Sequence, residues 1–294
     1  MGAVRVAGAI AAPALAVGVV GLAGPAGAAS ARTAQYPDGI VFHGDLTQDG
    51  IEDRFTLGDG APCGVNLEPG LPGGGFGPAV AHDYYVPPYA PGSTYCPDLA
   101  AVVDLGGDGV NELLLAWFNG DQGVPYIGDL IVLRDYAKVA SYEAVNQPSA
   151  IKTTDLNLDG LVDVYEDYGN SEPFISLLNT PSGELVPGPL RTTCGEATNT
   201  LADYDEDGRP DLLVAYLMPC VWPDGPSQGA MVVLDDGTQV PIFDERQEGF
   251  ADAYADRPVD ANGDGHLDVV AKEWFSGQVV AVFLGDGHGG FAAK

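Results

Sequence analysis

The sequence predicts an all-β protein built from about five repeated units, and three observations support this fold class. First, one nine-residue acidic pattern recurs five times along the 294 residues. Second, the chain contains 41 glycines and 23 prolines, which is typical of many short strands joined by turns. Third, short apolar runs follow the acidic patterns, and no stretch holds the periodicity of a helix.

Residues 1–28 have the composition of a signal peptide. Arg5 precedes an uncharged apolar run at 6–23, and Ala26-Gly27-Ala28 supplies the small residues of a cleavage site. The run is rich in alanine and glycine, which argues against the alternative of an uncleaved membrane anchor. We therefore expect a secreted, extracellular protein with no membrane insertion after signal removal, and a linker at 29–39 before the fold.

The charge balance excludes some partners. Lysine and arginine number 12 against 42 aspartates and glutamates, a formal net charge of −30. Nucleic acids and anionic membranes are bound by clustered cations, so neither is an expected partner. Apolar residues make up 46% of the chain and charged residues only 18%, which favours a folded core over a disordered acidic tail.

Four cysteines predict disulfides in an exported chain. Four cysteines allow three pairings. We favour the two pairs that are local in sequence, because each would close one excursion of the chain: Cys63–Cys96 and Cys194–Cys220. Cysteine ligation of a metal is less favoured, since no CxxC or Cys/His spacing occurs.

The five acidic patterns organise the chain into units. We name them loops 1 to 5, in chain order: Asp45–Asp53 (DLTQDGIED), Asp104–Glu112 (DLGGDGVNE), Asp155–Asp163 (DLNLDGLVD), Asp203–Asp211 (DYDEDGRPD) and Asp260–Asp268 (DANGDGHLD). They begin 48 to 59 residues apart, which is about the length of a four-stranded propeller blade. We therefore predict a β-propeller of about five four-stranded blades over residues 40–294, with repeats that start near 40, 99, 150, 198 and 251.

The segments between the loops have the character of strands. Nearly continuous apolar runs follow three loops, as in strands buried on both faces: Leu113–Trp117, Leu212–Tyr216 and Val269–Ala271. A second apolar run occurs further along four repeats: Leu130–Leu133, Phe174–Leu178, Met231–Leu234 and Val279–Leu284. Two of these runs lead into the hairpin signals Asp236-Gly237 and Asp286-Gly287.

Each loop has the front half of a calcium-binding loop. Aspartate at position 1, an oxygen-bearing residue at 3, aspartate at 5 and glycine at 6 bring hard oxygens together around a sharp turn. Position 7 would contribute its backbone carbonyl, and an acidic position 9 would close the shell. The predicted ligands are Asp45, Thr47, Asp49, Ile51 and Asp53; Asp104, Asp108, Val110 and Glu112; Asp155, Asn157, Asp159, Leu161 and Asp163; Asp203, Asp205, Asp207, Arg209 and Asp211; and Asp260, Asn262, Asp264, His266 and Asp268.

The repulsion among these carboxylates favours a bound cation over the alternative of solvated acidic turns, and it ranks the loops. Loop 4 has a carboxylate at positions 1, 3, 5 and 9, and we expect it to bind calcium most tightly. Loop 2 has Gly106 at position 3, so water must substitute and the site should be the weakest. Removing the Asp205 carboxylate should therefore lower the calcium-dependent melting temperature more than any change at Gly106 does.

These loops resemble the FG-GAP/VCBS repeat family, whose integrin-α-type calcium loop has the pattern D-x-[DN]-x-D-G-x-x-D. Phe291 after the glycine-rich segment 285–290 is similar to that family's blade end. The resemblance covers residues 40–294 and implies a propeller held by up to five Ca²⁺ ions. Family propellers often have seven blades, whereas five repeats fill this chain. A closed five-bladed ring is expected, with a strand near 39–43 completing the last blade; an open arc, or a ring completed by another chain, is the alternative.

Several aromatic residues are candidates for ligand binding. Trp117, Tyr168 and Tyr216 each follow the first aspartate of a loop by 13 residues, and Trp274 does so by 14. The strand that leaves each loop would carry these residues to the face of the propeller opposite the metal loops. We therefore predict that they form an aromatic rim on that face. Trp222 lies near the rim in sequence, and Tyr84, Tyr85, Tyr89 and Tyr95 lie in a segment expected at the surface. The alternative is that the rim residues pack between blades.

The predicted function is that of a calcium-dependent binding or adhesion module for an extracellular glycan or protein. The chain has no GxSxG, HExxH or P-loop motif, so we do not expect an enzyme. Two alternatives stay open. One is a carbohydrate-active lyase or hydrolase on a propeller scaffold, and the other is a purely structural surface protein.

Overall fold

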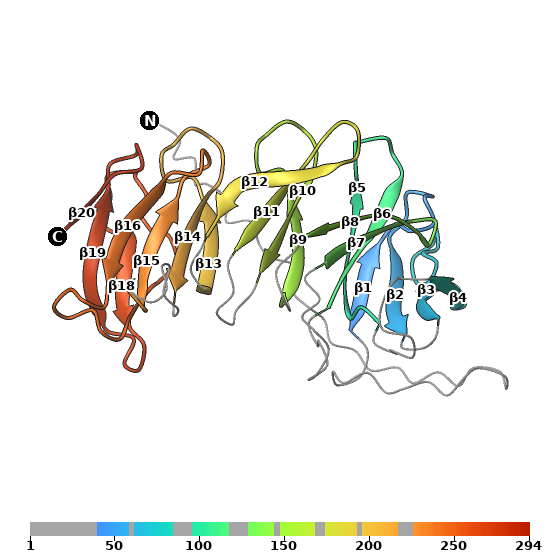
Figure 1. Cartoon of the computed structure of the whole chain (residues 1–294), viewed down its shortest axis with the longest axis horizontal. Coiled ribbons are helices and arrows are strands. Elements are labelled where there is room, and N and C mark those ends of the chain that lie inside the picture. Colours follow the sequence, from blue (N-terminus) through green and yellow to red (C-terminus); the bar gives the residue numbers. More distant parts are fainter. Residues whose placement is uncertain are drawn as a thin grey trace. The chain divides into compact units, whose positions relative to one another are not determined.

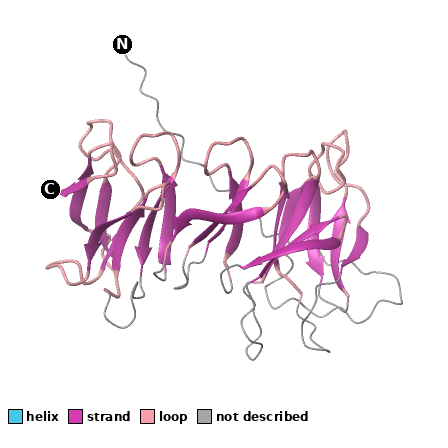
Figure 2. Cartoon of the chain, turned by 45° about the horizontal axis from the view of Figure 1, so that its top comes forward, coloured by secondary structure: helices cyan, strands magenta, loops and turns pink. Residues whose placement is uncertain are grey.

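The five sequence repeats fold as five four-stranded antiparallel sheets. The structure is a computed structural model, and it describes residues 40–58, 62–84, 96–117, 129–143, 148–167, 174–192, 196–216 and 226–294. Within these ranges the regular elements are all strands, and none is a helix (Figure 2). The protein is therefore all-β, as its sequence predicts.

Each sheet consists of four strands that are consecutive in the chain (Figure 1). Sheet 1 contains β1 (Val41–Gly44), β2 (Asp53–Gly58), β3 (Cys63–Glu68) and β4 (Val80–Tyr84). Sheet 2 contains β5 (Leu99–Asp104), β6 (Asn111–Ala116), β7 (Asp129–Arg134) and β8 (Ala137–Glu143). Sheet 3 contains β9 (Ala150–Thr154), β10 (Asp163–Asp167), β11 (Ile175–Asn179) and β12 (Leu185–Arg191).

The remaining two sheets repeat this arrangement. Sheet 4 contains β13 (Glu196–Ala202), β14 (Asp211–Tyr216), β15 (Gly229–Val233) and β16 (Gln239–Asp244). Sheet 5 contains β17 (Ala253–Ala255), β18 (Val269–Glu273), β19 (Val279–Gly285) and β20 (Phe291–Ala293). In all five sheets the acidic loop connects the first strand to the second.

The described chain divides into two compact units. One unit ends at Glu196 and contains sheets 1 to 3, and the other spans Ala197–Lys294 and contains sheets 4 and 5. In the first unit, strand β6 of sheet 2 is buried on both faces. Leu113 and Leu115 pack with residues of sheet 1, whereas Leu114 and Ala116 pack with residues of sheet 3. This two-sided burial explains why the sequence of β6 is continuously apolar rather than alternating.

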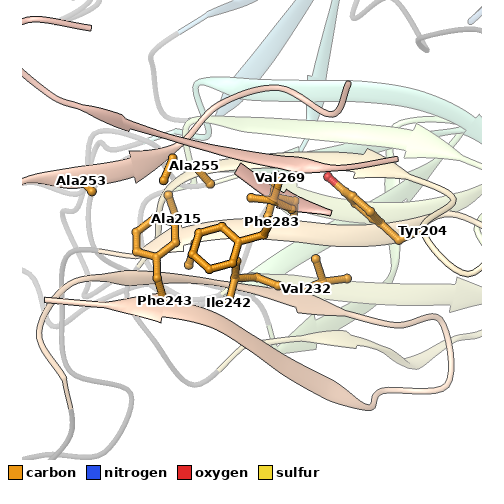
Figure 3. Close-up of a cluster of buried hydrophobic side chains, with 12 residues drawn as sticks. Tyr204, Ala215, Val232, Ile242, Phe243, Ala253, Ala255, Val269 and Phe283 are labelled. Atoms are coloured by element: carbon orange, nitrogen blue, oxygen red, sulfur yellow. The ribbon is translucent and has the colours of Figure 1, made fainter. Parts of the chain in front are cut away.

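The core of the second unit lies between sheets 4 and 5 (Figure 3). Leu213 and Ala215 of β14 pack here with Val269 and Ala271 of β18. The rings of Phe243 and Phe283 stack with their centroids 5.7 Å apart. Aromatic contacts of this kind add to the free energy of burial and fix how the sheet faces meet.

Two predictions about residues of sheet 1 are wrong. The strand near 39–43 was expected to complete the last blade, but β1 pairs with β2 in register Val41↔Thr56 and therefore belongs to sheet 1. Tyr84 was expected at the surface, but only 2% of it is exposed and it packs in the core of sheet 1. Tyr85, Tyr89 and Tyr95 lie outside the described residues.

The pairing Cys63–Cys96, which the sequence favoured among its alternatives, is present as a disulfide with a Cα–Cα distance of 5.6 Å. It ties the start of β3 to the segment that leads into β5, across a sequence separation of 33 residues. A cross-link of this length restricts the unfolded chain and so stabilises the fold. Cys194 and Cys220 lie outside the described residues.

Candidate metal centres

The five loops share one internal hydrogen-bond frame. In loop 3, Asp155 Oδ2 accepts the backbone N–H of Gly160 at 2.9 Å, and Asp159 Oδ1 accepts that of Leu161 at 2.8 Å. The same two bonds occur in the other loops, from Gly50, Gly109, Gly208 and Gly265 to position 1, and from Ile51, Val110, Arg209 and His266 to position 5. Positions 1 and 5 are thus held by the backbone around a tight curl.

Backbone conformation explains why the curl needs its glycine. The glycine at position 6 has a positive φ in every loop, between 82° and 99°. Position 4 is also left-handed in every loop, at Gln48, Gly107, Leu158, Glu206 and Gly263. The sequence predicts the first of these requirements but not the second. The signal was weak, because only two of the five loops have glycine at position 4.

The acidic residue at position 9 is a buried link between the loop and the third strand of the sheet. Asp163 is fully buried, and its Oδ2 accepts the N–H of Leu156 at 2.8 Å while its Oδ1 accepts that of Asn179 at 2.8 Å. Asp53, Asp211 and Asp268 make the corresponding pair of bonds. Position 9 therefore closes the loop against the sheet, whether or not it also contacts an ion.

Loop 4 concentrates the most negative charge. Carboxylate oxygens of Asp203, Asp205 and Asp211 all lie within 4.8 Å of one another. Asp203 Oδ1 is buried and has no hydrogen-bond partner. Burial raises the pKa of Asp211 to about 7 and raises that of Asp203 as well. An unpartnered buried oxygen beside two further carboxylates fits a cation, which would lower the energy of all three.

A fourth acidic group joins loop 4 from outside the repeat. Asp235, in the turn that follows β15, forms a second cluster with Asp205 and Asp207, again within 4.8 Å. The Arg209 guanidinium lies across the outer part of this cluster, 2.7 Å from Asp207 Oδ2 and 2.7 Å from Asp235 Oδ2. The sequence indicates neither contact, because Asp235 lies outside the nine-residue pattern and the pattern places no requirement on the side chain at position 7.

Loops 1, 3 and 5 have neutral oxygen donors at position 3. Asn157 Oδ1 accepts the N–H of Asp159 at 3.0 Å, and Asn262 Oδ1 accepts that of Asp264 at 2.8 Å. In loop 1 the Thr47 hydroxyl lies 3.3 Å from Asp53 Oδ1. Three carboxylates and one neutral oxygen in each loop are a donor set that suits a hard divalent ion such as calcium.

Loop 2 differs from the other four at position 9, where an arginine pairs with the buried acid; in loop 4, Arg209 pairs instead with position 5 and with Asp235. Arg134, the last residue of β7, donates through Nε to Glu112 Oε1, and its Nη2 lies 3.1 Å from Asp108 Oδ2. The hydrogen bond to Glu112 raises the pKa of Arg134. A cation from the protein itself therefore lies among the acidic side chains of this loop.

Side chains also connect neighbouring loops within each unit. Gln48 of loop 1 exchanges two hydrogen bonds with the backbone of Asn111 in loop 2, at 2.9 and 3.0 Å. His266 of loop 5 bonds through Nδ1 to Glu206 of loop 4, and this bond raises the pKa of His266. The loop pattern assigns position 7 only a backbone carbonyl, so the sequence did not predict this side-chain contact of His266.

Most of the predicted aromatic rim is not at the surface. Trp117 is 1% exposed and Tyr216 is 5% exposed, so both are core residues and neither is available to a ligand. Tyr168 and Trp222 lie outside the described residues. Trp274 is 38% exposed and stacks on Tyr254, with ring centroids 4.4 Å apart. A surface rim is therefore wrong for both residues: Trp117 packs between sheets 1 and 2, as the alternative proposed, and Tyr216 is buried.

The residues around Trp274 form an exposed apolar surface. Phe275 is 87% exposed and Val279 is 57% exposed, on the hairpin between β18 and β19. We call Trp274, Phe275 and Val279 the aromatic hairpin. Loop 5 precedes β18 and the aromatic hairpin follows it, so the two lie at opposite ends of this five-residue strand.

No model of a known protein family matches the chain, and no curated protein matches it. One similar solved structure is that of BBS1N in complex with ARL6DN, soaked with lead, with 12% identity, a TM-score of 0.39 and coverage of 81% of this chain. Another is the V. cholerae biofilm matrix protein Bap1, with 17% identity, a TM-score of 0.30 and coverage of 68% of this chain. The chain spans 66% and 38% of the lengths of these two proteins. Similarities at this level carry no argument about function.

The fold and the loops together define a class: an all-β protein of repeated four-stranded sheets, each with an acidic loop between its first two strands. The acidic clusters of loop 4 have the composition and spacing of a metal site. Among the residues that the structure describes, none belongs to a helix of the length and hydropathy needed to cross a bilayer.

Proposed function

We propose that the chain is a secreted calcium-binding β-propeller that acts as an adhesion or binding module for an extracellular glycan or protein. The observation that carries the proposal is the repeated loop frame, which brings carboxylates of positions 1, 3, 5 and 9 together in loop 4 and holds positions 1 and 5 alike in all five loops. Mutually repelling carboxylates held this close are stabilised by a divalent ion between them.

Calcium fits loops 1, 3, 4 and 5 best. Each has oxygen donors at positions 1, 3 and 5, a carbonyl at position 7 and a buried carboxylate at position 9. Calcium accepts such mixed oxygen sets, and extracellular calcium modules bind it in the range of about 10⁻⁴ to 10⁻³ M. When bound, the ion would offset two of the negative charges of the loop and hold the first two strands of the sheet together.

Secretion is supported by the disulfide and by the N-terminal sequence. The Cys63–Cys96 bond suits an oxidising compartment. Residues 1–28 have the charge, apolar run and small residues of a signal peptide. Calcium is abundant outside cells, so export and calcium binding support each other.

The aromatic hairpin is the surface best suited to a ligand. Phe275 projects with 87% of its surface exposed, and Trp274 is held flat against Tyr254. Solvent-exposed aromatic rings stack on sugar rings or anchor protein partners, because they bury apolar area at little conformational cost. We assign the ligand contact to Trp274 and Phe275, and the rigid support to the calcium loop at the other end of β18.

The test is binding to a glycan array and to extracellular matrix proteins, in millimolar calcium and in a chelator. We expect Phe275→Ala and the double variant Trp274→Ala/Phe275→Ala to lose about tenfold or more in affinity. Val139→Ala on β8 is the matched control, since Val139 is also an exposed apolar residue at 58% exposure.

Two results would contradict the proposal. Unchanged ligand binding by the double variant, with an unchanged melting temperature, would remove the aromatic hairpin as the contact. Release of unsaturated or reducing sugars from a polysaccharide would favour the alternative of a carbohydrate-active enzyme.

A further inference from the structure

The second loop contains a built-in positive charge. Arg134 is the last residue of β7, and its guanidinium bonds to Glu112 through Nε and Nη2. The same Nη2 lies 3.1 Å from Asp108 Oδ2. Glu112 is only 2% exposed, so its charge is compensated by this arginine in an environment that screens poorly.

The remaining oxygens of these two carboxylates are also engaged. Glu112 Oε2 accepts the N–H of Leu105 at 2.8 Å, and Asp108 Oδ1 accepts that of Val110 at 2.9 Å. In loop 4, by contrast, Asp203 Oδ1 is buried without a partner. Loop 2 therefore satisfies its acidic groups internally, whereas loop 4 leaves one oxygen for an ion.

The third position of loop 2 is closed to any ligand side chain. Gly106 has a φ of 84°, and a Cβ at this residue would lie 2.9 Å from the backbone nitrogen of Gly183. The Gly106 N–H donates to Asn179 Oδ1 at 3.0 Å. The β11–β12 turn of sheet 3 thus packs against position 3 of loop 2, where the other loops have a side chain with an oxygen donor.

We propose that loop 2 binds no divalent ion, because the Arg134 guanidinium takes the place of the cation. The chain then holds calcium in at most four of its five loops, and loop 2 is stable without calcium. The number of four calcium ions rests on the proposed function, which assigns calcium to loops 1, 3, 4 and 5. The role of Arg134 in loop 2 does not depend on that assignment.

The first test compares two matched variants. Asp104 and Asp155 both occupy position 1, and each accepts the N–H groups of positions 5 and 6. Bound calcium per chain is measured by equilibrium dialysis and elemental analysis for the full chain and for Asp104→Asn and Asp155→Asn. We expect Asp155→Asn to lose one ion and Asp104→Asn to lose none. Loss of one ion by Asp104→Asn would overturn the proposal.

The second test needs no calcium. In a chelator, Arg134→Gln should lower the melting temperature by about 5 °C or more, because Glu112 is left buried without its partner. Arg191→Gln, at an exposed arginine, is the control and should change it little. An unchanged melting temperature of Arg134→Gln would overturn the proposal. If Asp155→Asn loses no ion, the proposed calcium function fails instead, and the Arg134 variant still decides this inference.

Discussion

At the scale of single residues, position 4 of the loops requires a left-handed backbone conformation that is unfavourable for residues other than glycine. Leu158 has a φ of 59°, in the region that favours glycine, although its side chain is 57% exposed and contributes little burial. Gln48 and Glu206 have the same conformation, but their side chains bond to the neighbouring loop. Leu158 has no comparable polar side chain to offset the strain.

Replacing Leu158 with glycine should therefore stabilise the protein. We expect Leu158→Gly to raise the free energy of unfolding by about 0.5–1 kcal/mol, since relief of the left-handed strain exceeds the added entropy of the unfolded chain. Thermal and urea denaturation measure the change. Leu158→Ala keeps the Cβ and is the control, so a glycine variant no more stable than the alanine variant would contradict the explanation.

At the scale of the sheet, the buried acid at position 9 decides how a loop is attached. One oxygen of Asp163 holds the loop at Leu156, and the other holds the end of β11 at Asn179. Burial raises the pKa of Asp163, while these two bonds act to lower it. The residue, the first of β10, thus connects loop 3 to the end of β11 through a single carboxylate, independently of any metal.

Asp163→Asn tests this attachment with almost no change in shape. An amide has only one acceptor oxygen, so one of the two backbone N–H groups would face an NH₂ group. We expect a loss of about 2–3 kcal/mol in the free energy of unfolding, both with calcium and with a chelator. Asp129→Asn, at an exposed aspartate on β7, should change stability little. An effect of Asp163→Asn that appears only with calcium would assign position 9 to the ion instead.

At the scale of the whole molecule, the dominant property is its charge. The formal net charge is −30, and a large share of the carboxylates lies in five short loops. Charge of one sign destabilises a compact state through repulsion. Divalent ions bound in the loops would reduce that repulsion where it is strongest, and dissolved salt would reduce it everywhere over the Debye length.

Chelation should therefore destabilise the protein, and salt should restore part of the loss. At low ionic strength we expect a chelator to lower the melting temperature by about 5–10 °C. About 0.5 M sodium chloride should recover a fraction of this shift by screening. Calcium in excess of the chelator should recover all of it, and magnesium at the same concentration should recover less. A melting temperature that ignores the chelator would contradict the calcium assignment.

Much of the architecture could be predicted from local sequence. The nine-residue pattern identified the loops, because a curl of this kind depends on residues that are neighbours in the chain, such as Asp155 and Gly160. The continuous apolar run at β6 predicted burial on both faces, which the packing of Leu113 and Leu114 confirms. Of the disulfide pairings that the sequence allowed, the favoured Cys63–Cys96 bond is present.

Tertiary structure decided which side chains from outside the nine-residue pattern contact loops 2 and 4. Arg134 follows Glu112 by 22 residues and Asp235 follows Asp211 by 24, yet packing of the third strand brings each to its loop. The same packing buries Trp117 and Tyr216, whose spacing alone was equally consistent with a surface rim. Sequence periodicity records which residues alternate along one strand. Which side chain from another strand meets them depends on how the sheets pair and stack, and that is set by contacts distant in the chain.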